Sequence, residues 1–240
     1  MLDFHQTNPE NWRTAYEHLE SNFGYDRYSG IVHIIPNAGV VALGLLYGEG
    51  DFSRSIQITN MAGWDTDCNV GNVGAIVATA VGLQNIDESW RIPMNDLLVA
   101  SSIIGTRNLL TIPQCTDLTT NLGRIIHAQT TENYPRYHFK FDGSVNNFEA
   151  RGEKGRPIHI SQTTVDDVPA LRTSIRKLNK KGEVSIFTRT YYRPSELSSN
   201  YYEACFTPLI YAGQTISARI YIPEDAPADL YAALYVFDDN

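Results

Sequence analysis

The sequence predicts an α+β protein in which an all-α helical bundle portion, residues 1–130, is followed by an antiparallel β-sandwich, residues 131–240. The first part carries apolar residues at helical spacing and 12 of the 17 glycines. The second part carries 10 of the 14 tyrosines, in short β-branched and aromatic runs bounded by turn-forming residues. This change of pattern near residue 130 is the predicted domain boundary.

Six helices are predicted in the first part from apolar periodicity and end signals. The first is the most clearly marked, with Asn8 as its cap, Pro9 as its first residue and Gly24 as its stop. The sixth begins with a capping threonine. The other five predicted ranges are Asn37 to Leu46, Ser53 to Met61, Asn69 to Leu83, Asn95 to Leu110 and Thr116 to Gln129.

The range Asn69 to Leu83 is apolar on almost every side, which predicts a helix at the centre of the helical domain. Its small residues form a stripe against which another helix could approach closely. These residues are Gly71, Gly74, Ala75 and Ala78.

Short strands are predicted throughout the second part. The clearest alternation lies in Thr215 to Ile222, where every second residue is Ile or Ala and is expected to face the core. These inward residues are Ile216, Ala218, Ile220 and Ile222. The other predicted strands are Tyr137 to Phe141, Pro157 to Ile160, Val184 to Tyr192, Tyr202 to Phe206 and Leu230 to Phe237.

The net charge of −8 lies almost wholly in residues 1–130, which hold 13 acidic groups against 6 arginines. Such a surface repels phosphate backbones, so we expect no binding to nucleic acid. An anionic substrate would need metal cations as intermediaries. No apolar window is long enough to cross a bilayer, and three widely spaced cysteines favour a reducing compartment, so we expect a cytoplasmic protein without membrane contact.

The segment Gly63-Trp64-Asp65-Thr66-Asp67-Cys68-Asn69 places two carboxylates just before a predicted helix. In one interpretation, Asp67 or Thr66 caps that helix, and Asp65 adds negative charge near the positive end of the helix dipole. A calcium loop is excluded, because Val70 and Ile76 occupy the positions that need glycine and a bidentate acid. A magnesium site is the remaining alternative, if the segment turns so that the carboxylates converge. The local sequence does not decide between a helix cap and a metal site.

Three segments in order resemble the C-terminal part of the catalytic domain of the ADP-ribosylglycohydrolase family. They are Ile35-Pro36-Asn37-Ala38, Leu45-Leu46-Tyr47-Gly48-Glu49-Gly50-Asp51-Phe52 and Ala62-Gly63-Trp64-Asp65-Thr66-Asp67-Cys68-Asn69. The most specific is the Gly-x-Asp-Thr-Asp segment leading into a Gly/Ala-rich helix. The resemblance covers roughly residues 10–130.

This resemblance implies a helical bundle with a binuclear magnesium centre that hydrolyses N- or O-glycosidic bonds of ADP-ribosyl or related ribosyl substrates. Asp65 and Asp67 would be metal ligands. Cys68 stands where the family often has a threonine ligand, and a soft thiol suits magnesium poorly. The resemblance also suggests substrate contacts for Gly63, Trp64, Asn69, His33 and Asn37. Core packing for Trp64, a satisfied core histidine for His33 and a helix cap for Asn37 are the structural alternatives.

The family has a second acidic segment, of the Ser/Thr-Asp-Asp type, far upstream, and this chain begins too late to contain it. Asp166-Asp167, preceded by Val165, is not counted as its equivalent. We therefore expect the tail of a longer enzyme, inactive alone, which self-associates through its exposed apolar helices.

The segment Tyr137 to Ser144 resembles one that follows this domain in longer bacterial relatives. Four tyrosines further on could stack on sugars, so a carbohydrate-binding or structural module is the alternative function for residues 131–240. These tyrosines are Tyr191, Tyr192, Tyr201 and Tyr202.

Overall fold

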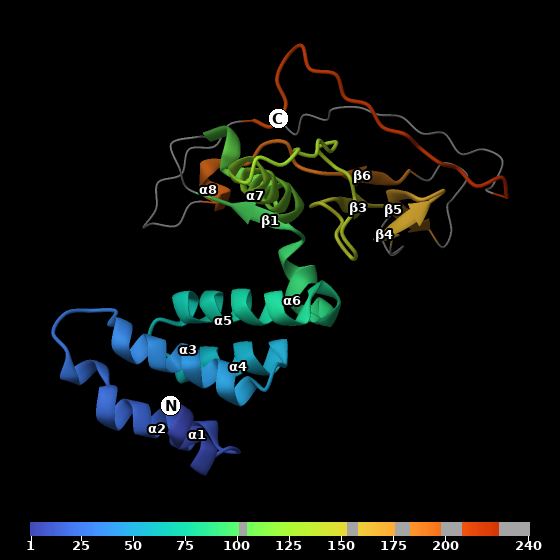
Figure 1. The fold of residues 1–240 in the computed structure, drawn as a ribbon. Helices are drawn as coiled ribbons and strands as arrows, with labels where there is room; N and C mark the ends of the chain where they lie inside the picture. Colours follow the sequence, from blue (N-terminus) through green and yellow to red (C-terminus); the bar gives the residue numbers. More distant parts are fainter. Residues whose placement is uncertain (101–104, 153–157, 176–182, 198–207, 226–240) are drawn as a thin grey trace. The chain divides into compact units, whose positions relative to one another are not determined.

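A computed structural model of the chain describes residues 1–100, 105–152, 158–175, 183–197 and 208–225. It confirms the α+β class (Figure 1). The α-helices are α1 (Leu2–Thr7), α2 (Trp12–Phe23), α3 (Ile34–Gly48), α4 (Phe52–Ala62), α5 (Thr66–Val81), α6 (Glu88–Arg91), α7 (Ile112–Ile126) and α8 (Pro194–Leu197). The single-turn 3-10 helices among these residues are η1 (Tyr25–Arg27), η2 (Leu83–Asn85), η3 (Ile92–Met94) and η4 (Gly105–Arg107). The strands are β1 (Leu97–Val99), β2 (Leu109–Thr111), β3 (Glu149–Arg151), β4 (Ile158–Val165), β5 (Val168–Ile175) and β6 (Ser185–Phe187).

Helices α3 and α4 form the middle of the helical part, with α2 and α5 on opposite sides of them (Figure 1). Helix α3 supplies three of the four largest fully buried side chains among the described residues, Val40, Leu43 and Tyr47. Tyr47 satisfies its buried hydroxyl by donating to the carbonyl oxygen of Asn8 at 2.7 Å. The helices predicted over 37–46 and 53–61 are confirmed as α3 and α4, and α4 is longer than predicted by one residue at each end.

Close helix approach occurs between α3 and α4, where a Cβ on Gly44 would overlap Thr59. The stripe predicted for close approach on α5 is confirmed in part: a Cβ on Gly74 would lie 3.2 Å from the Ile56 side chain of α4, whereas a Cβ on Gly71 would meet nothing within 4 Å and Ala75 is exposed. Helix α5 is not central, however. It packs along one side on α3 and α4, and its outer residue Ile76 is 50% exposed.

Two helix starts differ from prediction because a nearer capping residue is used. Helix α2 begins at Trp12, where the Asn11 side chain accepts from two backbone N–H groups, while Asn8 ends the short helix α1. Helix α7 begins at Ile112 with a full capping box of Thr111 and Gln114. Thr116 therefore lies inside α7.

The helix predicted over Asn95 to Leu110 is wrong for the described residues of that range. Asn95 and Asp96 have φ angles of 46° and 59°, in the left-handed region that stops a helix. Beyond them the chain forms strand β1, the single turn η4 and the start of β2.

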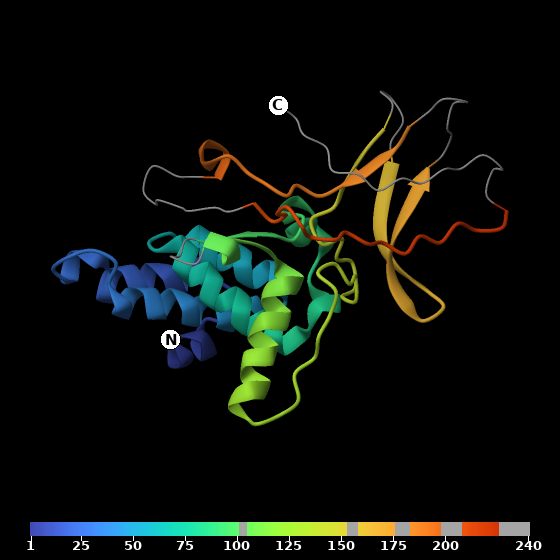
Figure 2. The same cartoon turned by 90° about the horizontal axis from the view of Figure 1, so that it is seen from above.

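The second part contains antiparallel strand pairs, β3 with β6 and β4 with β5. The β4–β5 hairpin (orange in Figure 2) is the largest of them, and it turns through Asp166 and Asp167 with φ of 48° and 60°. Such paired positive angles fit a two-residue hairpin turn, so these two aspartates have a structural explanation. The packed sheets of a sandwich are not seen among the described residues.

Of the other predicted strands, two are confirmed in part and two are wrong. Residues 158–160 lie in β4 and residues 185–187 form β6, whereas 137–141 have irregular backbone. Residues 215–222 were also predicted wrongly: they form no strand, and Ile216, Ile220 and Ile222 are 43%, 57% and 44% exposed. Alternation alone does not make a strand when no described neighbour pairs with it. The strands predicted over 202–206 and 230–237 lie outside the described residues.

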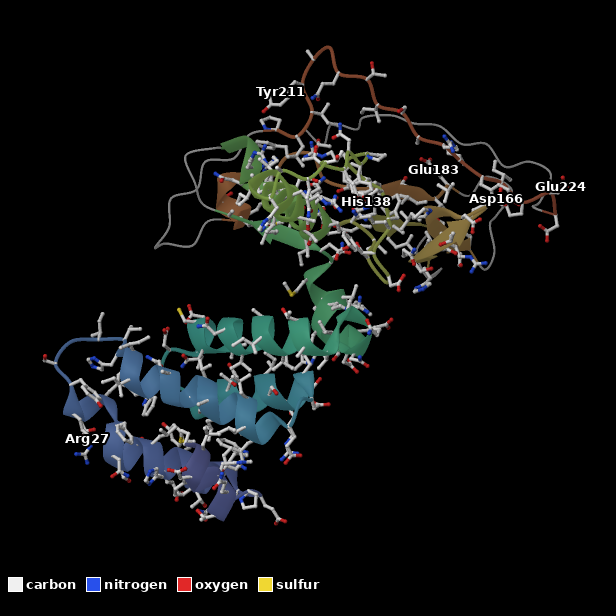
Figure 3. All side chains as sticks on the ribbon, viewed as in Figure 1. Arg27, His138, Asp166, Glu183, Tyr211 and Glu224 are labelled. Atoms are coloured by element: carbon white, nitrogen blue, oxygen red, sulfur yellow. The ribbon has the colours of Figure 1, made fainter. Side chains whose placement is uncertain are left out.

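A partly buried polar cluster attaches the segment after α7 to that helix. The Asp117 carboxylate accepts from His138 Nε2 at 2.7 Å and from Lys140 Nζ at 2.6 Å, and these three residues are called the α7 clamp below. The Lys140 backbone N–H donates to His138 Nδ1 at 3.2 Å, which leaves Nε2 as the protonated nitrogen. Figure 3 marks His138 in this segment.

Among the described residues, no helix has both the length and the apolar character needed to cross a membrane.

Candidate metal centre

A sharp turn between α4 and α5 brings the two aspartates of the Gly63–Asn69 segment to the start of α5. Gly63 has φ 79° and ψ −147°, a conformation that is open in practice only to glycine, and Trp64 follows with φ 57°. Asp65 then occupies the N-cap position of α5, and Asp67 lies in its first turn. The turn that convergence of the carboxylates requires is therefore present.

Asp65, Asp67 and Cys68 form a compact group of potential ligands. One carboxylate oxygen from each aspartate and the Cys68 sulfur all lie within 4.8 Å of one another. Asp65 is half-buried, whereas Asp67 and Cys68 are exposed. Both carboxylates also benefit from the positive end of the α5 dipole.

Helix capping does not account for these carboxylates. The Asp65 side chain makes no capping hydrogen bond, and Thr66 and Asp67 are already helical residues. The interpretation in which Asp67 or Thr66 caps the helix is therefore wrong. The two carboxylate groups remain available at the helix start for another ligand.

The Cys68 thiol differs chemically from its two neighbours. Its hydrogen bond to the Asp65 carboxylate is the main cause that raises the pKa of Cys68, and the charges of Asp65 and Asp67 raise it further. The thiol therefore stays protonated at neutral pH, which makes it a weak ligand for a hard cation. The donor set that fits a hard divalent ion is the pair of carboxylates.

The Asn37 side chain forms hydrogen bonds to the segment that carries Asp65 and Asn69. This side chain is only 5% exposed, and its Oδ1 accepts from Asn69 Nδ2 at 2.8 Å and from the Asp65 backbone N–H at 3.4 Å. Its Nδ2 donates to the Tyr25 hydroxyl at 2.6 Å and to the His33 carbonyl at 2.8 Å. One buried amide thus ties the start of α5 to α3 and to η1, and we call these contacts the Asn37 clamp.

Neither structural alternative for His33 and Asn37 is correct. Asn37 lies inside α3 and caps nothing, while His33 occupies the N-cap position of α3 without making a side-chain cap. The His33 Nε2 atom is buried and has no hydrogen-bond partner among the described residues. It is therefore not a satisfied core histidine.

Aromatic rings surround the clamp. Trp64 stacks on Tyr25 with centroids 5.2 Å apart and packs against the helical core. Tyr25 also meets the edge of His33 at 4.8 Å. Trp64 therefore packs against the core, which was the structural alternative to a substrate contact. Its ring stacks on Tyr25, a member of the Asn37 clamp.

A hollow of about 410 Å³ adjoins His33 at the start of α3. Its lining residues are Arg27, Tyr28, Ser29, His33, Ile34 and Ile35. Figure 3 marks Arg27 on the turn that joins α2 to α3. Sequence reasoning missed Tyr25, Arg27 and Tyr28, although the aromatic and charged run between Gly24 and Gly30 was a usable signal for a functional loop.

The remaining candidate residues lie elsewhere. Tyr191 is 47% exposed, whereas Tyr192 is 6% exposed and packs under the Arg189 guanidinium at 4.3 Å. Tyr201 and Tyr202 lie outside the described residues. Sugar stacking by a row of four tyrosines thus gains no support from the two that are described.

The family model for ADP-ribosylglycohydrolase matches residues 2–130, more than half of the chain. No curated protein and no solved structure matches the chain significantly. The matched range contains the Asp65–Cys68 group, the Asn37 clamp and the hollow at His33. The chain therefore belongs to the ADP-ribosylglycohydrolase family.

Proposed function

We propose that this chain carries part of the active centre of a magnesium-dependent hydrolase that cleaves ADP-ribosyl or related ribosyl glycosidic linkages. The observation that carries the proposal is the pair of carboxylates, Asp65 and Asp67, gathered at the start of α5 and not used as helix caps. Family membership adds hydrolase chemistry and ADP-ribosylated substrates.

Asp65 and Asp67 would hold the metal. Magnesium typically takes one or two protein carboxylates and keeps several waters, which suits a pair of oxygen donors on an accessible helix start. Cys68 is left out of this ligand set because its thiol is protonated and soft. When bound, magnesium would supply Lewis-acid polarisation and orient the ribose hydroxyls.

Further acidic ligands are needed for a binuclear centre. Among the described residues, Asp65, Asp67 and Cys68 are the only group of three or more acidic, histidine or cysteine side chains close enough to share an ion. We propose that a separate acidic segment completes the centre. The described site alone should bind magnesium weakly, because two carboxylates and water molecules would have to replace the larger number of protein ligands in a complete binuclear centre.

The chain's own residues would position the substrate. The Asn37 clamp fixes the backbone of Asp65 and the side chain of Asn69, so both asparagines act as positioning residues rather than substrate contacts. Arg27 and His33 line the hollow at the start of α3, where backbone N–H groups lack a side-chain cap. These groups would attract a diphosphate in an otherwise acidic domain.

For residues 131–240 we propose the role of an accessory domain, which their sequence pattern predicts. We propose it as a structural module rather than a sugar-binding one, since Tyr192 is buried. We also propose self-association of the helical part, because large apolar side chains on its surface are exposed. Ile34 and Ile76, for example, are 79% and 50% exposed.

The test is release of ADP-ribose from an ADP-ribosylated substrate by the natural full-length protein. Asp65→Asn and Asp67→Asn should each lower kcat/KM by at least about 100-fold, since a metal ligand contributes more than the outer residues whose loss costs 10–100-fold. Asp3→Asn, in the exposed first turn of α1, is the matched control and should retain activity. Undiminished turnover in either variant of the pair would refute the proposal.

A further inference from the structure

The thiol of Cys68 lies beside the two carboxylates at the start of α5. Its Sγ atom and one oxygen from each of Asp65 and Asp67 lie within 4.8 Å of one another. Among the described residues, no other group of three or more acidic, histidine or cysteine side chains is gathered this closely. Cys68 is exposed and forms no disulfide, so its sulfur is accessible to an ion from solvent and has no role in core packing.

The spacing of these three donor atoms is close to that of a zinc site. Zinc binds sulfur at about 2.3 Å and carboxylate oxygen at about 2.0–2.2 Å, which places tetrahedral ligands about 3.3–3.8 Å apart. The Asp67 and Cys68 side chains are exposed, so packing does not oppose a movement of about 1 Å at their ends. Asp65 is half-buried, and Asn37 accepts a hydrogen bond from its backbone N–H. One anchored donor and two adjustable ones can therefore meet at a single ion.

The mixed donor set distinguishes hard ions from softer ones. Magnesium uses oxygen ligands, so the two carboxylates serve it and the thiol adds nothing. Zinc binds thiolate and carboxylate ligands in the same site, and three protein ligands with one water form its usual open arrangement. The group at the start of α5 thus offers zinc one more protein ligand than it offers magnesium.

We propose that Asp65, Asp67 and Cys68 bind Zn²⁺ as a three-ligand site, and that zinc bound there excludes magnesium from the proposed catalytic centre. This inference rests on the proposed function, because the two carboxylates are the same ones that hold magnesium. When zinc binds, the Cys68 S–H bond breaks, an S–Zn bond forms in its place and the proton passes to solvent. No group is oxidised or reduced in this step.

The binding test is a calorimetric titration of the full chain with ZnCl₂. The chain should bind a zinc ion that Cys68→Ser weakens at least about 100-fold, because a direct ligand contributes more than the outer residues whose loss costs 10–100-fold. Cys115→Ser, which removes the other free cysteine among the described residues, is the matched control and should keep the affinity of the parent. Cys68→Ser should still bind magnesium at least as tightly as the parent, since a hydroxyl is a hard oxygen donor. That result would show that the start of α5 is intact in the variant.

Cobalt substitution identifies the sulfur ligand directly. A Co²⁺ ion bound to a thiolate gives an intense sulfur-to-metal charge-transfer absorption, which carboxylate ligands do not give. This absorption should appear in the parent and in Cys115→Ser, and it should be absent from Cys68→Ser. Its persistence in Cys68→Ser, or equal zinc affinity in Cys68→Ser and the parent, would overturn the proposed site.

Magnesium titration of the zinc-loaded chain tests the exclusion of magnesium. Zinc should abolish magnesium binding in the parent and in Cys115→Ser, and unchanged magnesium binding in the zinc-loaded parent would overturn this part of the proposal. None of these measurements depends on turnover. Loss of zinc binding would therefore leave the proposed hydrolase function untouched, whereas failure to release ADP-ribose would count against that function alone.

Discussion

Replacing Asn37 by alanine should loosen the start of α5 and destabilise the helical part. The substitution removes the acceptor of Asn69 Nδ2, a side chain only 2% exposed, and the donor to the Tyr25 hydroxyl. The buried Asn69 amide left unsatisfied costs about 1–3 kcal/mol, and the partly buried Tyr25 bond contributes about 1 kcal/mol. The His33 carbonyl keeps the backbone N–H of residue 37 as a donor, so it adds little. We expect a loss of about 3 kcal/mol in the free energy of unfolding.

Urea unfolding followed by circular dichroism measures this loss. With an m-value of about 3 kcal/mol/M, the midpoint should fall by about 1 M. Asn72→Ala is the matched control, because that asparagine lies on α5 and is exposed, and it should change stability by no more than about 0.5 kcal/mol.

A double-mutant cycle isolates the hydrogen bond between the two buried asparagines. Asn37→Ala and Asn69→Ala remove the same interaction, so their effects should be non-additive by about 1 kcal/mol or more. Additivity within about 0.5 kcal/mol, or an Asn37→Ala effect no larger than that of Asn72→Ala, would refute the clamp as the element that positions Asp65.

Three further predictions concern packing, thiol chemistry and the α7 clamp. Gly44→Ala should destabilise by about 1–3 kcal/mol through overlap with α4, whereas Gly71→Ala, with open space around it, should be neutral or slightly stabilising in thermal unfolding. Alkylation of Cys68 at pH 8 should be faster in Asp65→Asn, because loss of the hydrogen bond and charge lowers the thiol pKa; an unchanged rate would contradict this. Asp117→Ala should cost about 2–3 kcal/mol in urea unfolding, and a loss under about 0.5 kcal/mol would show the clamp to be unimportant.

The helices of the first part were predictable because their signals are local. The pattern of α4 placed its ends, predicted at Ser53 and Met61, within one residue of the observed Phe52–Ala62. Prediction failed where an adjacent residue competed for the same role, as when Thr111 rather than Thr116 capped α7. It failed again at Asn95 and Asp96, whose left-handed backbone carries no apolar signature.

The carboxylate pair was also readable, since its motif is contiguous in the sequence. Convergence of Asp65 and Asp67 depends on the turn at Gly63 and Trp64, and the glycine gave a hint of it. The contacts of Asn37 could not be read in this way. Its hydrogen bonds reach Tyr25 and Asn69 on other elements, so they depend on how the helices pack and not on local pattern.

The alternation in Thr215 to Ile222 shows the opposite error. A period of two is necessary for a half-buried strand, but a strand forms only when a neighbour supplies backbone partners. Among the described residues none does so, and the isoleucines that were expected to face a core are exposed. Pairing is a non-local property that alternation cannot establish.

The magnesium dependence of ADP-ribose release, compared between the natural full-length protein and its Asp67→Asn variant, tests the central claim most directly. If Asp67 is a ligand, half-maximal activity in the variant should require at least about tenfold more magnesium, and chelation should abolish activity in both proteins. Identical magnesium curves for the two proteins, or full activity in the presence of chelator, would contradict a metal centre at Asp65 and Asp67.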